Sequence, residues 1–424
     1  MNKADENFID LKMKMLNWAD QFNIFCLLDN NGYSFEHPSF ECLLAVGCER
    51  SYTFTGENDF ATLQSFFDEK PSWLFGHLGY NAASNSYEEN TNTRVDFKKG
   101  FFFEPEIIIK LSDNNIEILK SNVAATDILE NIKNFDGNNI EESSALKIIP
   151  VFTREEYLHK IAVLQQYIKR GDCYEINFCQ QFVAENALVN VVKTYKQLTA
   201  VSPAPFGSFY KLHNNYCLCA SPERFLQKKG NQLISQPIKG TSRREADVEK
   251  DEANKNYLIE STKEKSENVM VVDLVRNDMS MVCEKGSVKV KELFGIYSFP
   301  QVHQMISTIQ GTLAAGKTFT DAINACFPMG SMTGAPKKRV MQLIEKYEDG
   351  ERGLFSGSIG YITPVGDFDF NVVIRSIFYN KEKKRLSFFA GSGITFYSNA
   401  EEEYEECMMK AQAIVNILSE KNNS

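Results

Sequence analysis

The stretch DFDFNVVIRSIFYNKEKKRLSFFAGSGIT, residues 367–395, contains two apolar runs around a short charged segment. Both runs are rich in β-branched and aromatic residues, which is typical of strands. No helical segment separates them. Successive strands without an intervening helix favour antiparallel sheets over a doubly wound parallel sheet.

The rest of the chain also contains apolar runs typical of strands, together with segments that have helical signals. Further strands are predicted at 173–183, 206–212, 216–221 and 231–238. Thr153 and Glu156 form a capping box that opens a helix ending near Gly171. Other helices are expected over 251–278, from Pro336 at its first helical position to residue 347, and over 400–420. Strands in runs, flanked by helices, predict an α+β fold.

Composition excludes several classes of protein. The chain has 424 residues, 43% of them hydrophobic, and a formal charge of -10, which argues against a broad nucleic-acid-binding face. It begins without a secretory signal and has no apolar run of roughly 20 residues, so we expect a cytoplasmic protein without membrane contact. The ten cysteines form no CxxC pair, which indicates buried, reduced thiols.

An Asn-rich segment, 134–147, is the best candidate for a linker. It separates a first region, 1–135, from a second region, 150–419. The first region shows short apolar runs punctuated by Gly, Asn and Asp, which indicates mostly strands.

Two pairs of glutamates stand three residues apart on predicted helices: Glu264 with Glu267, and Glu403 with Glu406. Residues at this spacing share a helical face. If the two faces meet, the carboxylates need a cation, and oxygen ligands favour Mg²⁺. Taken alone, such pairs are more often solvated.

Lys239, in PIKGT, is either a solvated lysine or a nucleophile in a pocket. Glu223 lies across a predicted hairpin from it, so both residues can return to one end of a sheet and tune each other's pKa. Arg375 follows Val373 by two in a strand, which places it on an apolar face. An arginine there either meets an internal carboxylate or clamps a ligand carboxylate.

Several motifs occur together in a fixed order and resemble those of the chorismate-utilising enzymes. They cover about residues 150–415: GDCYEINFCQQF, SPERF, PIKGTSRR, KEKSENVMVVDLVRND, GSMTGAPKKRVMQLI, RGLFSGSIGYI, GSGI and EEEYEECMMKAQA. FCLLDN and FGHLGYNAA match the amino-terminal part of this family more loosely. The resemblance implies two stacked antiparallel sheets flanked by helices, with 1–135 and 150–419 in one intertwined unit.

The resemblance also implies roles for individual residues. It assigns Mg²⁺ to Glu267 and Glu406, with Glu264 and Glu403 holding metal-bound water. It places catalysis on Lys239, Glu223 and Thr241. It assigns the substrate carboxylates to Tyr361, Arg375, Lys410 and a turn formed by Gly391, Ser392 and Gly393. LLDN and SPAPFGSF resemble the family's tryptophan-binding region, here Leu28, Asp29, Pro205 and Phe206.

Two positions divide the family by chemistry. Members that add water carry a lysine where this chain has Glu175, and members that make anthranilate carry an alanine where it has Lys239. The resemblance therefore implies amination of chorismate at C4. Ammonia would come from a separate glutamine amidotransferase, because the chain has no G-x-C-x-G signature. The alternatives are anthranilate formation and a non-catalytic protein that senses tryptophan or chorismate.

Two departures from the family pattern stand out. Gln304 occupies a position that is histidine in most relatives, and strand alternation points His303 the other way. Glu175 replaces a residue that is glutamine in many nitrogen-transferring relatives. A carboxylate there binds ammonium, shifts the pKa of Lys239, or faces the surface.

Overall fold

The structure is a computed structural model that describes residues 3–33, 40–83, 94–112, 115–135, 146–299 and 302–419. Most of the predicted linker at 134–147 lies outside these ranges. None of the helices described is long and apolar enough to cross a membrane.

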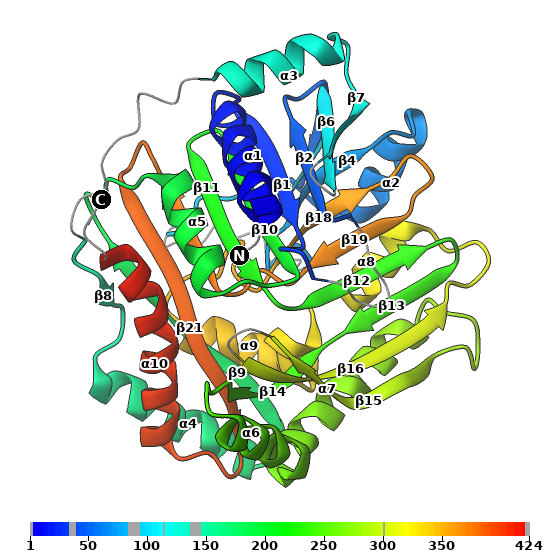
Figure 1. Cartoon of the computed structure of the whole chain (residues 1–424). Helices are drawn as coiled ribbons and strands as arrows, with labels where there is room; N and C mark the ends of the chain where they lie inside the picture. The colour runs from blue at the N-terminus through cyan, green and yellow to red at the C-terminus, as the bar shows by residue number, and fades with distance from the viewer. Residues whose placement is uncertain are drawn as a thin grey trace.

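The first sheet, sheet A, is antiparallel throughout (Figure 1). In spatial order its strands are β17 (Gly334–Ala335), β9 (Glu175–Ala184), β21 (Arg385–Thr395), β20 (Ser376–Asn380), β11 (Asn215–Ser221), β10 (Phe206–Leu212), β1 (Ile24–Asp29), β2 (Cys42–Val46), β6 (Ile107–Ser112) and β7 (Asn115–Lys120), with β8 (Ile149–Pro150) beside β9.

The second sheet, sheet B, is also antiparallel. Its order is β14 (Ile238–Arg243), β16 (Val302–Thr312), β13 (Gln232–Gln236), β12 (Arg224–Lys229), β19 (Phe368–Asn371), β18 (Ser358–Ile362), β4 (Leu74–Leu78), β5 (Gly100–Glu104) and β3 (Arg50–Thr53), with β15 (Lys289–Ser298) beside β16. The predicted α+β fold with two antiparallel sheets is confirmed.

Both sheets contain strands from both regions of the chain. In sheet A, β1 pairs with β10 from Ile24 opposite Leu212 to Asp29 opposite Gly207. In sheet B, β4 pairs with β18, with Gly76 opposite Gly360. A glycine is required at both positions. A Cβ atom on Gly76 would lie 2.1 Å from the Phe101 carbonyl oxygen of β5, and one on Gly360 would lie 2.1 Å from the Asp369 carbonyl oxygen of β19.

Burial on both faces explains the apolar strands. In β1, Ile24 and Cys26 belong to the hydrophobic cluster between the sheets, while Phe25 and Leu27 belong to the cluster on the outer face of sheet A. A strand in such a central layer is apolar at successive positions instead of alternating.

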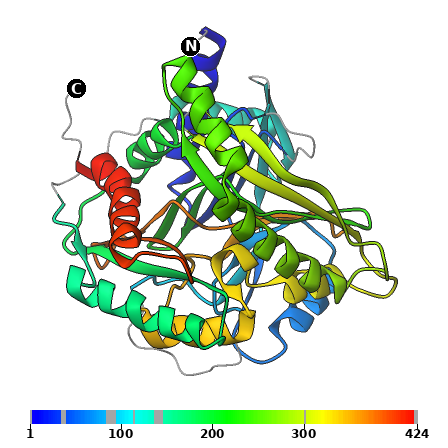
Figure 2. The same ribbon diagram turned by 90° about the horizontal axis from the view of Figure 1, so that it is seen from below.

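Helices cover the outer faces of the two sheets. On sheet A the outer cluster includes side chains of α1 (Lys3–Ala19), α3 (Ala125–Asn134), α4 (Arg154–Lys169), α5 (Val191–Val201), α9 (Lys337–Tyr347) and α10 (Ala400–Ser419). On sheet B the packing helices are α2 (Asp59–Glu69), α7 (Thr262–Ser280) and α8 (Phe319–Cys326). Figure 2 shows α4 and α9 side by side, where Lys160 Nζ donates a 2.8 Å hydrogen bond to the Tyr347 carbonyl.

Several local predictions are confirmed and others are wrong at their ends. The Thr153–Glu156 capping box is present, and all ten cysteines are free. The helix expected over 251–278 is two helices, α6 (Val248–Glu260) and α7, which meet at Ser261, where the side chain caps α7. Pro336 is the residue before α9, not its first helical residue.

The predicted strand 367–379 is divided between the two sheets. Its first part is β19 in sheet B, and its second part is β20 in sheet A. Arg375 lies between them with φ of 50°, in the left-handed region that non-glycine residues rarely adopt. The prediction that Arg375 belongs to a regular alternating strand is therefore wrong, because the chain crosses there from one sheet to the other.

Candidate active site

Lys239 lies on β14, at the end of sheet B, and reaches across to sheet A. Its Nζ atom forms an ion pair with Glu175 Oε1 at the start of β9, and the side chains are 11% and 3% exposed. The predicted turn around Lys239 is instead a strand, which pairs with β16 and contains a bulge between Ile238 and Thr241. Gly240 takes a φ of 94° in this bulge.

Burial and charge oppose each other at Lys239. Burial lowers the pKa of its amine, but the carboxylates of Glu175, Glu267 and Glu223 raise it, so that the net pKa is above the usual value. The solvated-lysine alternative is wrong, since Lys239 is enclosed among carboxylates.

Glu223 follows β11 and precedes β12, and its side chain lies near the same lysine. Burial raises the pKa of this carboxyl to about 7, although the charges of Lys239 and Arg375 lower it in part. The predicted hairpin, β12 with β13, thus returns Glu223 and Lys239 to one end of sheet B. A carboxyl that titrates near neutrality is suited to donate and accept protons.

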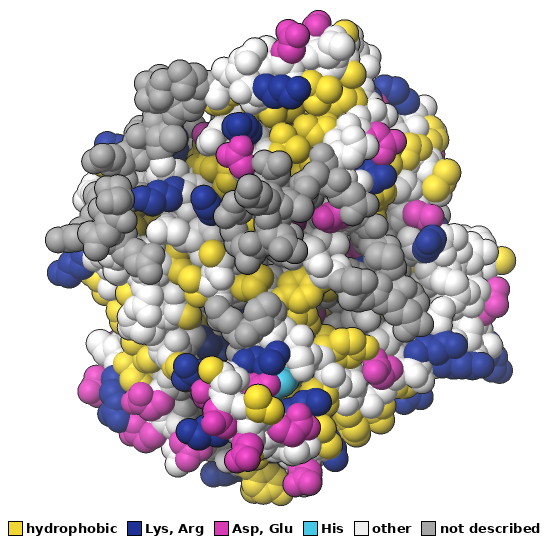
Figure 3. Space-filling model, in the orientation of Figure 1, with side chains coloured by type: hydrophobic (Ala, Val, Ile, Leu, Met, Phe, Trp, Pro, Cys, Tyr) yellow, Lys and Arg dark blue, Asp and Glu magenta, His cyan; other side chains and the backbone are white. Residues whose placement is uncertain are grey.

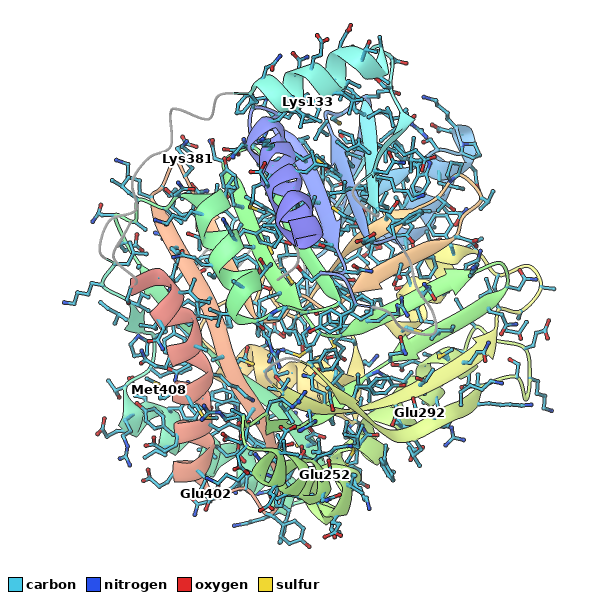
Figure 4. All side chains as sticks on the ribbon, in the orientation of Figure 1. Lys133, Glu252, Glu292, Lys381, Glu402 and Met408 are labelled. Carbon is cyan, nitrogen blue, oxygen red and sulfur yellow. The ribbon has the colours of Figure 1, made fainter. Side chains whose placement is uncertain are left out.

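The two glutamate pairs lie on α7 and α10. The electrostatic interaction of Lys263 with all four carboxylates raises the pKa of its amine, against the lowering effect of burial. The carboxylates of both helices are therefore within electrostatic range of one lysine. Figure 4 shows Glu402 and Met408 on α10, the helix that carries Glu403 and Glu406.

The carboxylates differ in their partners. Burial raises the pKa of Glu267 to about 7, and its buried Oε1 atom has no hydrogen-bond donor among the described residues. Glu403 accepts a hydrogen bond from the Ser392 hydroxyl, and Glu406 pairs with Lys410 at 2.6 Å. Burial also raises the pKa of Glu264.

The carboxylate oxygens of these glutamates are of the kind that Mg²⁺ prefers, and the predicted magnesium site stays a prediction. Within the described part of the chain, no three His, Cys, Asp or Glu side chains are arranged to hold one ion. Mg²⁺ does not require three, because it is usually bound by one or two carboxylates and keeps several waters. The Oε1 atom of Glu267, which has no hydrogen-bond donor in the part of the chain that the structure describes, is a carboxylate oxygen that a bound cation would contact.

The predicted turn at Gly391–Gly393 lies inside strand β21, which corrects the prediction. β20 pairs with β21 only as far as Phe388, whereas β9 pairs with it as far as Thr395. One edge of residues 389–395 therefore has no neighbouring strand among the described residues. Side chains of α10 already donate to the carbonyls of Ala390 and Gly391, and the other backbone groups on this edge are available to a ligand.

The two glycines of this segment allow close approach. A Cβ atom on Gly391 would lie 2.1 Å from the Phe178 carbonyl oxygen, and one on Gly393 would lie 2.6 Å from Glu175 Oε1 and 3.0 Å from Lys239 Nζ. A side chain at position 393 would therefore displace the ends of the Glu175 and Lys239 side chains from their present positions.

The other predicted substrate contacts fall in two places. Arg375 interacts with Glu223 and Tyr33, and burial lowers the pKa of its guanidinium. Lys410 Nζ donates a 3.0 Å hydrogen bond to the Gly391 carbonyl. Tyr361 instead lies among the rings of Trp73 and Phe40, in a separate pocket.

This separate pocket is the predicted tryptophan region. Its lining includes Leu28, Asp29, Pro205 and Phe206, so the structure brings the four predicted residues together. The carboxylate of Asp29 is already paired with Lys12 at 2.6 Å, and both side chains are buried.

Strand alternation is confirmed at residues 303 and 304. His303 hydrogen-bonds through Nδ1 to Ser298 and through Nε2 to Asp251. Gln304 lies opposite Thr241 in the β14–β16 register, and its buried Oε1 atom has no hydrogen-bond partner among the described residues.

Two residues of the site were missed in the sequence, although both lie in quoted motifs. Lys263 precedes Glu264 in KEKSEN. Arg352, in RGLFSG, is 2% exposed and donates to the carbonyls of Met332 and Asn177. It also pairs with Glu348, which accepts a hydrogen bond from the backbone of Cys179. Nothing in the local pattern distinguishes these cations from solvated ones.

The chain matches the family model of chorismate binding enzymes over residues 25–416. It belongs to that family.

Particular relatives are more specific. Aminodeoxychorismate synthase component 1 of Klebsiella aerogenes is 40% identical over 266 residues, which are 63% of this chain and 58% of that protein. An anthranilate synthase component I-like protein of Synechocystis is 33% identical over 358 residues, 82% of this chain and 72% of that protein. The match thus spans less than two thirds of the Klebsiella relative.

Solved structures show the same fold. Anthranilate synthase component I from Streptococcus pneumoniae superposes with a TM-score of 0.77 and 24% identity, covering 91% of this chain and 94% of that one. The menaquinone-specific isochorismate synthase of Escherichia coli gives 0.76 and 16%, covering 96% and 91%.

Proposed function

We propose that this protein aminates chorismate at C4 to give 4-amino-4-deoxychorismate, the precursor of para-aminobenzoate and folate. The observation that carries the proposal is the position of Lys239, enclosed by Glu175, Glu223 and Glu267 at one end of the sheets. Relatives that are 40% identical over the matched region are named for this activity.

Lys239 is the proposed nucleophile. Its neutral amine attacks C2 of the ring, both ring double bonds shift by one position, and the C4–O bond breaks. Glu223 gives its proton to the departing oxygen, which leaves as water; a pKa of about 7 suits this step. Ammonia then attacks C4, both double bonds shift back, the C2–N bond breaks, and Lys239 is released.

The substrate carboxylates are the charges that fix the ring in this proposal. Arg375, Lys410 and the free edge at Gly391–Gly393 would bind them. Glu267 and Glu406 would hold Mg²⁺, with Glu264 and Glu403 around it, and the bound ion would offset the charge of the ring carboxylate. In this proposal Thr241 hydrogen-bonds near the C4 hydroxyl of the substrate. Tyr361 would contact a substrate carboxylate from the neighbouring pocket.

We infer that ammonia comes from a separate glutamine amidotransferase. The relatives carry the designation component 1, and this chain lacks a glutaminase signature. The two regions, 1–135 and 150–419 within one intertwined fold, and the cytoplasmic location stay predictions. The pocket lined by Leu28, Asp29, Pro205 and Phe206 would bind tryptophan.

One experiment tests the proposal. The protein is incubated with chorismate, Mg²⁺ and ammonium, and the products are separated by chromatography and identified by mass. We expect 4-amino-4-deoxychorismate, its loss in Lys239→Ala, and a covalent adduct on Lys239 when ammonium is omitted. Undiminished turnover in Lys239→Ala would contradict the mechanism.

The Synechocystis relative supports a second candidate, anthranilate formation, because its match covers more of both chains. This reaction eliminates pyruvate, so the same assay distinguishes the two by the release of pyruvate and the fluorescence of anthranilate. Absence of turnover with retained binding of chorismate or tryptophan would instead indicate a sensor.

A further inference from the structure

The contact between Glu175 and Lys239 poses a chemical problem. In the structure the lysine is paired with a carboxylate, and the surrounding charges favour its ammonium form. An ammonium has no lone pair and cannot attack a ring carbon. The amine must therefore lose its proton to a nearby group before the proposed reaction starts.

The other carboxylates near Lys239 have other roles in the proposed mechanism. Glu223 must be protonated to release the C4 oxygen, and Glu267 belongs with Glu406 to the magnesium site. Glu264 and Glu406 interact with Lys239 electrostatically from α7 and α10. Among the contacts described, the one direct ion pair of Lys239 is with Glu175.

We propose that Glu175 is the catalytic proton acceptor for Lys239, which releases the amine for attack and returns the proton at the end of the cycle. This inference rests on the proposed function. It gives Glu175 a role distinct from that of Glu223, which acts on the substrate oxygen.

The backbone at Glu175 is paired with a strand on each side. This pairing fixes the position of the residue that would accept the proton. In sheet A, Glu175 lies opposite Thr395 of β21 and opposite Ala335 of β17. Gly334 and Gly393 allow these strands to come close: a Cβ atom on Gly334 would lie 2.1 Å from the Glu175 carbonyl oxygen. The carboxylate is therefore positioned by two strands of its own sheet while it contacts a lysine of the other.

The proton balance closes over one cycle. The proton moves from Lys239 Nζ to Glu175, and the neutral amine attacks C2 while Glu223 protonates the leaving hydroxyl. After ammonia displaces the lysine, the new C4 ammonium returns a proton to Glu223. Glu175 returns its proton to Lys239. The net change is chorismate plus ammonia to the aminated product plus water, with no oxidant or further reactant.

The first arm of the test needs no chorismate. The full chain is labelled with acetic anhydride at pH 8, and the acetylation rate of Lys239 is measured by peptide mass spectrometry. Glu175→Gln removes the charge that keeps the amine protonated, so Lys239 should be labelled several-fold faster. Glu185→Gln is the matched control, since Glu185 follows the other end of β9 and pairs with Arg385 on the surface.

The second arm measures the Lys239 adduct in a single turnover with chorismate and Mg²⁺ but no ammonium. Glu175→Gln should slow adduct formation at pH 7 by about 100-fold, within the range of general base catalysis, with partial recovery as the pH rises toward 10. Glu175→Asp should retain part of the rate, and Glu185→Gln all of it.

The combination of results decides the inference. Faster acetylation with slower adduct formation supports it, because a loss of positioning alone would not make the amine more reactive. Unchanged adduct formation in Glu175→Gln, or a loss that does not depend on pH, overturns it. If the unsubstituted protein forms neither adduct nor product, the proposed function fails, while the acetylation arm still reports on the pair.

Discussion

At the scale of single residues, the site contains a buried acid whose charge state is set near neutrality. Glu223 is 4% exposed, and burial raises its pKa to about 7. In the proposed mechanism Glu223 donates a proton and must be protonated, so we expect kcat/KM to fall as the pH rises through 7. The measurement is a pH profile at a constant concentration of free ammonia, which separates this group from the titration of ammonium.

The same carboxyl also links stability to pH. The folded state binds a proton more tightly than the unfolded chain does, so its stability decreases as the pH rises from about 4.5 to above 7. Glu223→Gln should remove this loss, on the order of 2–3 kcal/mol at pH 8, and abolish turnover. Urea unfolding at pH 8 and pH 5 checks it. A gain of equal size at pH 5 would contradict the assignment to ionisation.

Gly393 gives a steric prediction. A Cβ atom there would lie 2.6 Å from Glu175 Oε1 and 3.0 Å from Lys239 Nζ. Gly393→Ala should therefore displace the ion pair and lower kcat by tenfold or more, with little change in stability, because the atoms that must move are the ends of two flexible side chains. Gly56→Ala is the control, because nothing lies within 4 Å of its Cβ position. Steady-state kinetics and thermal unfolding measure both effects.

At the scale of elements, Arg352 connects three segments around the site. It links the η1 turn (Gly330–Met332), strand β9 and Glu348 at the end of α9, with side chains 1% and 4% exposed in the ion pair. Arg352→Met should cost about 3–5 kcal/mol, because it leaves Glu348 buried without its partner. The double variant Arg352→Met with Glu348→Met should recover much of that loss in chemical denaturation. Arg154, which pairs with Glu401 on the surface, is the control.

Elements also show what the sequence could and could not predict. The helix start at Thr153 was predictable because its signal is local: a hydroxyl and a carboxylate at fixed spacing. The division of 367–379 into β19 and β20 was not, because both parts are apolar strands. Residues 372–375 leave the strand conformation, with Arg375 at a positive φ, and this break depends on two sheets meeting there.

In the candidate site, too, local motifs were predictable and contacts between distant segments were not. Lys239, Glu223 and the glutamate pairs were identified because their motifs are long and ordered. The GSG segment was misassigned to a turn, since glycine is favoured both by turns and by close strand approach. The pairing of Glu175 with Lys239 joins residues from two sheets, and local pattern contains no information on such contacts.

At the scale of the whole molecule, charge and connectivity are the relevant features. On the face shown in Figure 3, acidic and basic side chains are interspersed over the lower part, where Figure 1 places α4, α6 and α10. The active site gathers its cations locally instead, with Lys239, Lys263 and Lys410 among glutamates. In the proposed function, these local cations would bind an anionic substrate on a protein of negative net charge.

The shared sheets predict that the chain does not divide into independent halves. A fragment of residues 146–424 lacks β1 and β4, which exposes the edges of β10 and β18. Exposed strand edges promote aggregation. We expect this fragment to be insoluble alone and to be recovered on co-expression with residues 1–145. Sedimentation and circular dichroism check this, and a soluble, cooperatively unfolding fragment would contradict it.

The pairing of β4 with β18 has a consequence for synthesis on the ribosome. Leu74–Leu78 pairs with Ser358–Ile362 in the folded sheet, so one edge of β4 stays without its partner strand until most of the chain has been synthesised. Such distant pairings slow folding, and an unpaired edge is prone to mispairing in the meantime. We expect the nascent chain to depend on chaperones until β18 emerges, and its yield to rise when translation is slowed by cold.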